Sequence, residues 1–141
     1  MSGFLLDTNC ISEVIRPKPD PRVVDWMRAV DESLLYLSIL TLGEIRAGAA
    51  VLPHSKRRAY LENWLELDVR VRFSGRILGI DDVVADRWGW LTAEAERKGR
   101  PLAAVDGLLA ATALEYNLTV VSRNVGDFES THVPILNPWE A

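Results

Sequence analysis

The sequence PLAAVDGLLAATALEYNLTVVSRNVGDF, from Pro101 to Phe128, predicts a helix, a strand and a polar loop in close succession. Small apolar residues dominate the helix, and an acid, Asp106, stands near its start. A tight connection at Tyr116-Asn117 leads into a short apolar strand, Leu118 to Val121. This order of elements is typical of an α/β protein, in which helices pack against a sheet.

The polar loop Ser122-Arg123-Asn124 follows that strand, and a further acid, Asp127, comes just after it. In open α/β sheets, ligands bind at loops that follow the carboxyl ends of the strands. Two carboxylates, Asp106 and Asp127, brought to such an edge therefore indicate a cation site.

The rest of the chain also alternates short apolar strands with helices, which predicts one α/β domain over 1–141 with a parallel sheet between helices. Helix starts are indicated at Asp20-Pro21, where Asp caps and Pro takes the first position, and at Thr41, which forms a capping-box pattern with Glu44. The expected strands are 3–6, 34–37, 77–80 and 133–136, and the expected helices are 8–15, 20–30, 41–50, 55–71 and one from 81 or 82 to about 97.

The composition is that of an ordinary soluble protein, with 141 residues, 48% hydrophobic and 26% charged. No apolar run approaches the roughly 20 residues of a membrane span, and the first residues lack the basic segment of a signal peptide. The lone cysteine, Cys10, excludes an internal disulfide, so we expect a cytoplasmic protein with no membrane association. The net charge of −4 argues against nucleic-acid binding by bulk positive charge.

Four acids fall at equivalent places in this pattern. Asp7 ends the first strand, Glu44 lies at the head of the helix after the second, and Asp106 and Asp127 flank the fourth. Carboxylates this close would repel one another and raise their pKa values, a conflict that Mg²⁺ or Mn²⁺ would resolve. Such an ion lowers the pKa of a bound water, so the pattern indicates metal-assisted hydrolysis of a phosphate ester.

Each acid also has a plainer interpretation. Asp7 could form an Asx-turn or cap the next helix, and Glu44 could be only the capping-box partner of Thr41. Asp106 could complement a helix dipole, and Asp127 could be an ordinary loop acid. Their joint placement at one sheet edge favours a functional site.

Several motifs, taken together, resemble a PIN-domain protein and, more narrowly, the VapC toxins of bacterial toxin–antitoxin modules, especially the FitB-like branch. The resemblance covers nearly the whole chain. It rests on Leu5-Leu6-Asp7-Thr8-Asn9, Thr41-Leu42-Gly43-Glu44, the stretch from Ala104 to Ala113, Ser122-Arg123-Asn124, Asp127-Phe128 and Asn137-Pro138-Trp139.

The resemblance implies a three-layer α/β/α sandwich and a ribonuclease that depends on Mg²⁺ or Mn²⁺. Asp7, Glu44 and Asp106 would take the core acidic positions, with Asp7 and Asp106 as metal ligands, and Asp127 would take a fourth, more variable position. Ser122 stands where the family usually has Thr, so the hydroxyl is kept. The residues expected to orient the acids and water are Thr8, Asn9, Ser122 and Asn124.

The resemblance also implies a cognate antitoxin that covers the active site, a homodimer, and contact with DNA only through the antitoxin. Among the five tryptophans, Trp64 and Trp88 lie on apolar helix faces and are expected in the core. Trp90 lies off the apolar stripe of its helix and is the better candidate for an interface.

Arg123, beside the acids, is the base most suited to hold a phosphate of the RNA substrate, because arginine binds phosphates bidentately. The basic runs at 56–58, 70–76 and 97–100 could also meet phosphates, although a solvated helix face explains such runs more often.

Two other functions remain to be weighed. A binding module would keep the fold with a weak site and act with a DNA-binding antitoxin as a repressor. A phosphatase of the haloacid dehalogenase type needs a second acid two residues after the first, where this chain has Asn9.

Overall fold

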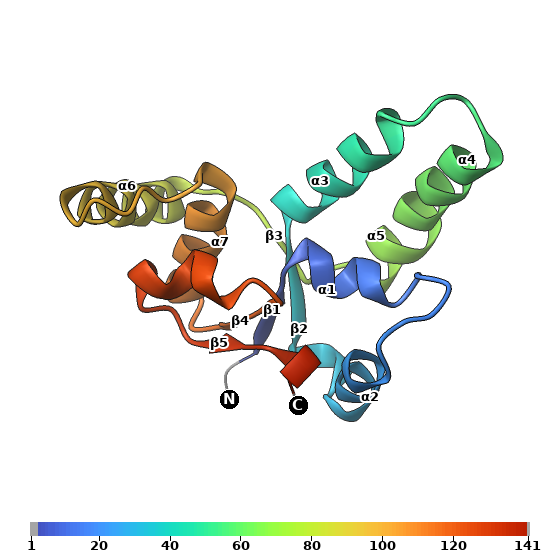
Figure 1. Cartoon of the computed structure of the whole chain (residues 1–141), viewed down its shortest axis with the longest axis horizontal. Helices are drawn as coiled ribbons and strands as arrows, with labels where there is room; N and C mark the ends of the chain where they lie inside the picture. The colour runs from blue at the N-terminus through green and yellow to red at the C-terminus, as the bar shows by residue number, and fades with distance from the viewer. Residues whose placement is uncertain (1–2, 141) are drawn as a thin grey trace.

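The computed structural model describes residues 3–140, and its centre is a five-stranded sheet in the order β3-β2-β1-β4-β5 (Figure 1). Every adjacent pair is parallel, and β1 pairs on one side with β2, Leu5 opposite Tyr36, and on the other with β4, Leu5 opposite Val120. The expected parallel sheet is therefore confirmed. The strands are β1 (Phe4–Leu6), β2 (Leu35–Ser38), β3 (Ile77–Leu78), β4 (Thr119–Val121) and β5 (Ile135–Leu136).

Helices cover both faces of this sheet. Short 3₁₀ segments are η1 (Glu32–Leu34), η3 (Val125–Thr131) and η4 (Pro138–Glu140), and η2 (Trp64–Val69) is π-helical. The α-helices are α1 (Thr8–Glu13), α2 (Pro21–Ala29), α3 (Ile39–Ala50), α4 (Lys56–Asn63), α5 (Arg70–Arg72), α6 (Asp82–Arg97) and α7 (Ala104–Glu115).

Alternation along the strands divides the buried side chains between two cores, because successive residues of a strand point to opposite faces. Leu6 and Val121 pack with α1 to α4, η2 and η4, whereas Leu5 and Val120 pack with α6, α7 and η3. In Figure 1, α6 and α7 accordingly lie on one side of the strands, with α1 to α5 on the other. This confirms the three-layer α/β/α sandwich.

Capping side chains fix several helix starts as expected. Asp20 accepts a hydrogen bond from the backbone N–H of Arg22 at 2.9 Å, with Pro21 at the first position of α2. Asp81 accepts one from the N–H of Val84 at 2.9 Å and begins α6. Such caps pair backbone donors that the helix itself leaves free.

The capping box predicted between Thr41 and Glu44 is wrong. Helix α3 begins two residues earlier, at Ile39, and its cap is Ser38, whose hydroxyl accepts from the N–H of Leu40 at 3.0 Å. Thr41 is therefore buried inside the helix, which leaves the carboxylate of Glu44 free for a partner elsewhere.

The tryptophans divide as expected between core and surface. Trp64 is buried in the core under α1 to α5, and Trp88 is half-buried against the core under α6 and α7. Trp90 is 67% exposed. No helix within residues 3–140 is both long and apolar enough to cross a membrane.

Candidate functional site

Asp7 is the buried centre of the site. It follows β1 directly and caps α1, with Oδ1 accepting from the N–H of Thr8 at 2.8 Å. Its Oδ2 accepts from the hydroxyl of Ser122 at 2.8 Å. Only 8% of Asp7 is exposed, and this burial raises the pKa of its carboxyl, although the two hydrogen bonds oppose the rise.

The loop after β4 is hydrogen-bonded to the loop after β1 through the side chains of Ser122 and Asn9. Ser122 Oγ accepts from Asn9 Nδ2 at 3.2 Å and from the N–H of Asn124 at 3.0 Å. Asn9 Oδ1 in turn accepts from the N–H of Arg123 at 3.4 Å. Because β1 and β4 are adjacent parallel strands, the two loops meet at one edge and hold Asp7 in a fixed orientation.

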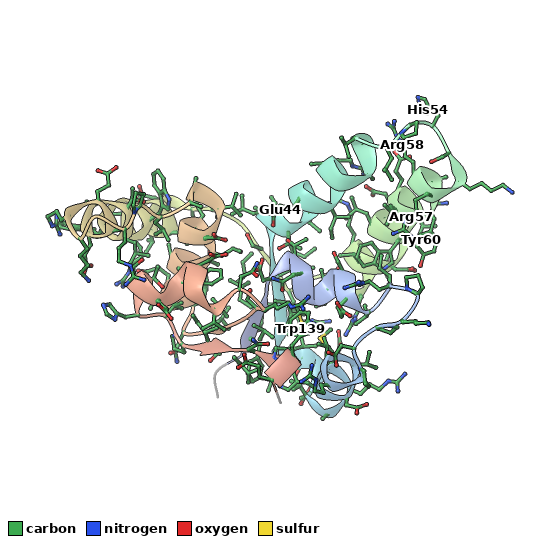
Figure 2. The ribbon with its side chains drawn as sticks, in the orientation of Figure 1. Glu44, His54, Arg57, Arg58, Tyr60 and Trp139 are labelled. Atoms are coloured by element: carbon green, nitrogen blue, oxygen red, sulfur yellow. The ribbon has the colours of Figure 1, made fainter. Side chains whose placement is uncertain are left out.

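Glu44 lies in α3, and its carboxylate contacts a residue of α1 rather than the start of its own helix. The hydroxyl of Thr8 donates to Glu44 Oε1 at 2.5 Å and lies 3.4 Å from the hydroxyl of Thr41. Glu44 is exposed and lies near the start of α3, where that helix leaves the sheet (Figure 2). The Thr41 hydroxyl, absent from the expected site, is thus part of it, and only a contact across 33 residues of sequence reveals this.

Asp106 and Asp127 both line a depression of about 260 Å³. Asp106 lies in the first turn of α7, whose cap position, Ala103, offers no side-chain acceptor. Burial, and then the charges of Asp127, Asp7 and Glu44, raise the pKa of Asp106 to about 6. The other three predicted acids therefore lie within electrostatic reach of Asp106.

These carboxylates are suited to a hydrated divalent ion rather than to a closed protein cage. Within residues 3–140, no three histidine, cysteine or acidic side chains converge closely enough to enclose an ion. Mg²⁺ usually keeps several waters and binds through one or two carboxylates, and oxygen donors suit Mg²⁺ or Mn²⁺. Asp7 and Asp106 could supply such donors, and an ion there would offset the charges of Asp127, Asp7 and Glu44, which together with burial raise the pKa of Asp106.

Arg123 lies beside this cluster but turns toward another part of the surface. Its guanidinium Cζ lies 5.7 Å from the ring centroid of Trp139, within range of a cation–π interaction. No sequence pattern predicts Trp139 as the neighbour of Arg123, because Trp139 lies near the C-terminal end of the described residues.

The raised pKa of Asp106 makes the metal-free protein less stable as pH rises. Since the folded state holds this proton more tightly, the stabilisation is complete below pH 3.8 and is lost as pH rises through about 6. Asp106→Asn removes the titration, so without divalent ions we expect it to be about 1 kcal/mol more stable than wild type well above pH 6, after allowance for solvent screening. Urea unfolding in EDTA across this pH range measures the free energy of unfolding of both proteins. A free energy of unfolding that does not change with pH in either protein would contradict this prediction.

Ser122 is expected to be the most sensitive of the supporting residues, because its side chain is fully buried and its hydroxyl hydrogen-bonds three groups. Ser122→Ala leaves Asp7 and its neighbours short of partners, which should lower the free energy of unfolding by about 1–3 kcal/mol. Ser122→Thr keeps the hydroxyl and is the matched control. Urea denaturation compares the two, and equal losses would show that packing rather than hydrogen bonding explains the effect.

A family model described as the PIN domain matches residues 4–132. The chain belongs to the PIN-domain family. This PIN domain is 42% identical over 136 residues to "Toxin FitB" of Neisseria gonorrhoeae, a match that covers 96% of this chain and 98% of the relative. It is 38% identical to "VapC ribonuclease Y4jK" of Sinorhizobium fredii, with 97% and 98% covered.

A solved structure described as FitAB bound to an IR36 DNA fragment superposes on this PIN domain with a TM-score of 0.91 and 40% identity. The match covers 96% of this chain and 95% of the solved one. The resemblance found from the motifs is thereby confirmed at the level of sequence and of fold.

Proposed function

We propose that this PIN domain is an endoribonuclease that depends on Mg²⁺ or Mn²⁺ and acts as the toxin of a toxin–antitoxin pair. The observation that carries the proposal is that three carboxylates, Asp7, Glu44 and Asp127, lie within electrostatic reach of Asp106 at the carboxyl edge of the sheet. Similarity over nearly the full length to proteins named FitB toxin and VapC ribonuclease supports it.

Asp7 and Asp106 are the proposed ligands of the ion, because both carboxylates are partly withdrawn from water and carry raised pKa values. When bound, the ion would lower the pKa of a water molecule and stabilise the charge that develops on the phosphodiester. Asp7 is held ready for this by its hydrogen bonds to Thr8 and Ser122, so little reorganisation accompanies binding.

Glu44 and Asp127 have a different proposed role. Both are exposed at the rim of the site, where their carboxylates can hydrogen-bond the attacking water and take up its proton. Thr8 orients Glu44, and the N–H of Asp127 donates to the carbonyl of Asn124 at 3.1 Å, which fixes its loop.

The proposed partners are RNA as substrate, a cognate antitoxin, a second copy of the chain, and DNA only through the antitoxin. The solved FitAB structure with DNA supports this set. A cytoplasmic location fits an enzyme that acts on cellular RNA. The exposed Trp90 on α6 is the residue we propose for a protein interface.

The binding-module alternative is favoured by one observation, the lack of a preformed three-ligand cage among the described residues. It predicts complex formation without turnover. The phosphatase alternative is rejected, because the position two residues after Asp7 is Asn9, whose amide donates to Ser122 rather than serving as an acid.

The test is cleavage of bacterial total RNA by purified, antitoxin-free protein in Mg²⁺, in Mn²⁺ and in EDTA. We expect discrete fragments with either metal and none in EDTA. Asp7→Asn, purified in the same way, controls for contaminating nucleases, and equal cleavage by both proteins would reveal contamination. Intact RNA under every condition would refute the ribonuclease and favour the binding module.

A further inference from the structure

A second depression, of about 640 Å³, lies beside the carboxylate site. The end of α1, the loop 16–20 and the first residues of α2 form one wall, and Arg123 and Trp139 form the other. Figure 2 shows Trp139 where the C-terminal segment meets α1 and α2. We call this depression the Arg123 pocket.

The Arg123 pocket is joined to the carboxylate site by the backbone. Arg123 directly follows Ser122, whose hydroxyl donates to Asp7, and the N–H of Arg123 donates to Asn9 Oδ1 at 3.4 Å. The residue that opens into the pocket is therefore positioned by the same hydrogen bonds that orient Asp7. A ligand chain that reaches Asp7 can extend into the pocket past Arg123.

The pocket carries a net positive charge in a protein whose formal net charge is −4. Two carboxylates line it, and both are occupied by structural contacts. Glu13 is 5% exposed and accepts from the N–H of Asp20 at 2.9 Å and from Arg16 at 3.3 Å. Asp20 caps α2 and receives two side-chain hydrogen bonds from Arg22, at 2.9 and 3.2 Å.

Two cations remain, Lys18 and Arg123. Within residues 3–140 neither forms an ion pair with an acid, whereas most other arginines of the chain do, for example Arg72 with Glu32. Arg123 is held instead by the ring of Trp139. Trp139 is 6% exposed, and its backbone N–H donates to Asn137 Oδ1 at 2.9 Å. A guanidinium oriented by an aromatic ring keeps its N–H donors for an anion.

We propose that the Arg123 pocket binds a backbone phosphate of the RNA strand that flanks the bond to be cut, with Arg123 and Lys18 as the phosphate ligands. The proposal rests on the ribonuclease function above. Arginine recognises phosphate bidentately, and lysine adds a point charge on a flexible stem. The pocket offsets locally the negative charge of the four acids, which would otherwise repel the substrate.

An acidic segment of a protein partner is the other anion that this pocket could accept. The RNA strand is favoured because the pocket continues from the loop that holds Asp7, so a strand placed for cleavage passes Arg123. A protein segment has no comparable reason to follow that path.

The test measures binding of a short fluorescein-labelled single-stranded RNA by anisotropy, in the Asp106→Asn background so that the strand stays intact. Arg123→Gln and Lys18→Gln are compared with Arg28→Gln, which removes the same charge from an exposed position in the last turn of α2. We expect Arg123→Gln and Lys18→Gln each to weaken binding about tenfold and to lower the slope of log K against log[salt] by about 0.7, the value for one phosphate of a single strand. Arg28→Gln is expected to leave the slope unchanged.

The outcomes separate this inference from the proposed function. Equal slopes for all three variants, together with cleavage by wild type, would overturn the Arg123 pocket and leave the ribonuclease standing. Unchanged RNA binding with weakened antitoxin binding would overturn it in favour of an acidic protein segment. Failure of wild type to cleave RNA in either metal would refute the function itself. Thermal unfolding by circular dichroism confirms that each variant is folded.

Discussion

Asp106→Asn is expected to lower the rate of RNA cleavage by about 10³-fold at saturating Mg²⁺, the largest effect of any single change in the site. The substitution keeps the size of the side chain and removes the charge that the proposed ion requires. It also removes the carboxyl whose pKa is raised to about 6 by burial and by the charges of the other three acids. The measurement is single-turnover cleavage of a labelled RNA.

A second measurement, the effect of Mg²⁺ on the unfolding temperature, distinguishes loss of metal binding from loss of folding. Mg²⁺ should raise the unfolding temperature of wild type, because a ligand that binds only the folded state stabilises it by about 2.7 kcal/mol at 100 times its Kd. Asp106→Asn should gain little from Mg²⁺ while being at least as stable as wild type in EDTA. Undiminished cleavage by the variant, or an equal Mg²⁺ shift in both proteins, would remove Asp106 from the metal site.

Phe128→Ala is expected to lower the free energy of unfolding by about 3–5 kcal/mol, because it removes a fully buried ring from a packed core. Phe128 also anchors η3, and its neighbour Asp127 lies at the rim of the site. The variant should therefore lose cleavage activity even at temperatures where it remains folded. Urea denaturation and RNA cleavage on the same preparation measure both effects.

Phe73→Ala is the matched control. Phe73 is also fully buried, but it lies in the other core and precedes β3, toward the amino ends of the strands and away from the acids. We expect a similar loss of stability and wild-type cleavage in the folded protein. Equal losses of activity in both variants would show that Phe128 acts only through global stability. Leu substitutions at both positions repeat the comparison with smaller losses of stability.

Much of the fold follows from local chemistry that is visible in the sequence. Short apolar runs predicted all five strands, because a strand buried on both faces has no polar residues to interrupt it. Asp20-Pro21 and Asp81 marked helix starts, since their side chains cap their own helices. The start of α3 was predicted at Thr41 instead of Ile39. Its cap, Ser38, lies among apolar residues and is also the last residue of β2, so the local sequence does not mark it as a helix cap.

The candidate site could be predicted only as far as residue type and strand position allow. The sequence predicts the four acids at one edge, because parallel strands bring their carboxyl ends together, and in the structure the other three lie within electrostatic reach of Asp106. The contact between Thr8 and Glu44 was not predictable, since the local capping box offered an equally reasonable partner for Glu44. Arg123 lies near Trp139 because η4 packs against α2, and no local sequence pattern predicts that packing.

The hydrogen bond between Ser122 and Asp7 spans 115 residues of sequence. Its two partners leave the ribosome far apart in time, and Asp7 has neither Ser122 nor Asp106 beside it until most of the chain has been made. The site is therefore assembled only when β4 inserts next to β1, near the end of synthesis. A growing or truncated chain that lacks β4 has no oriented Asp7, so the proposed active site cannot form in a chain until its own β4 has been synthesised.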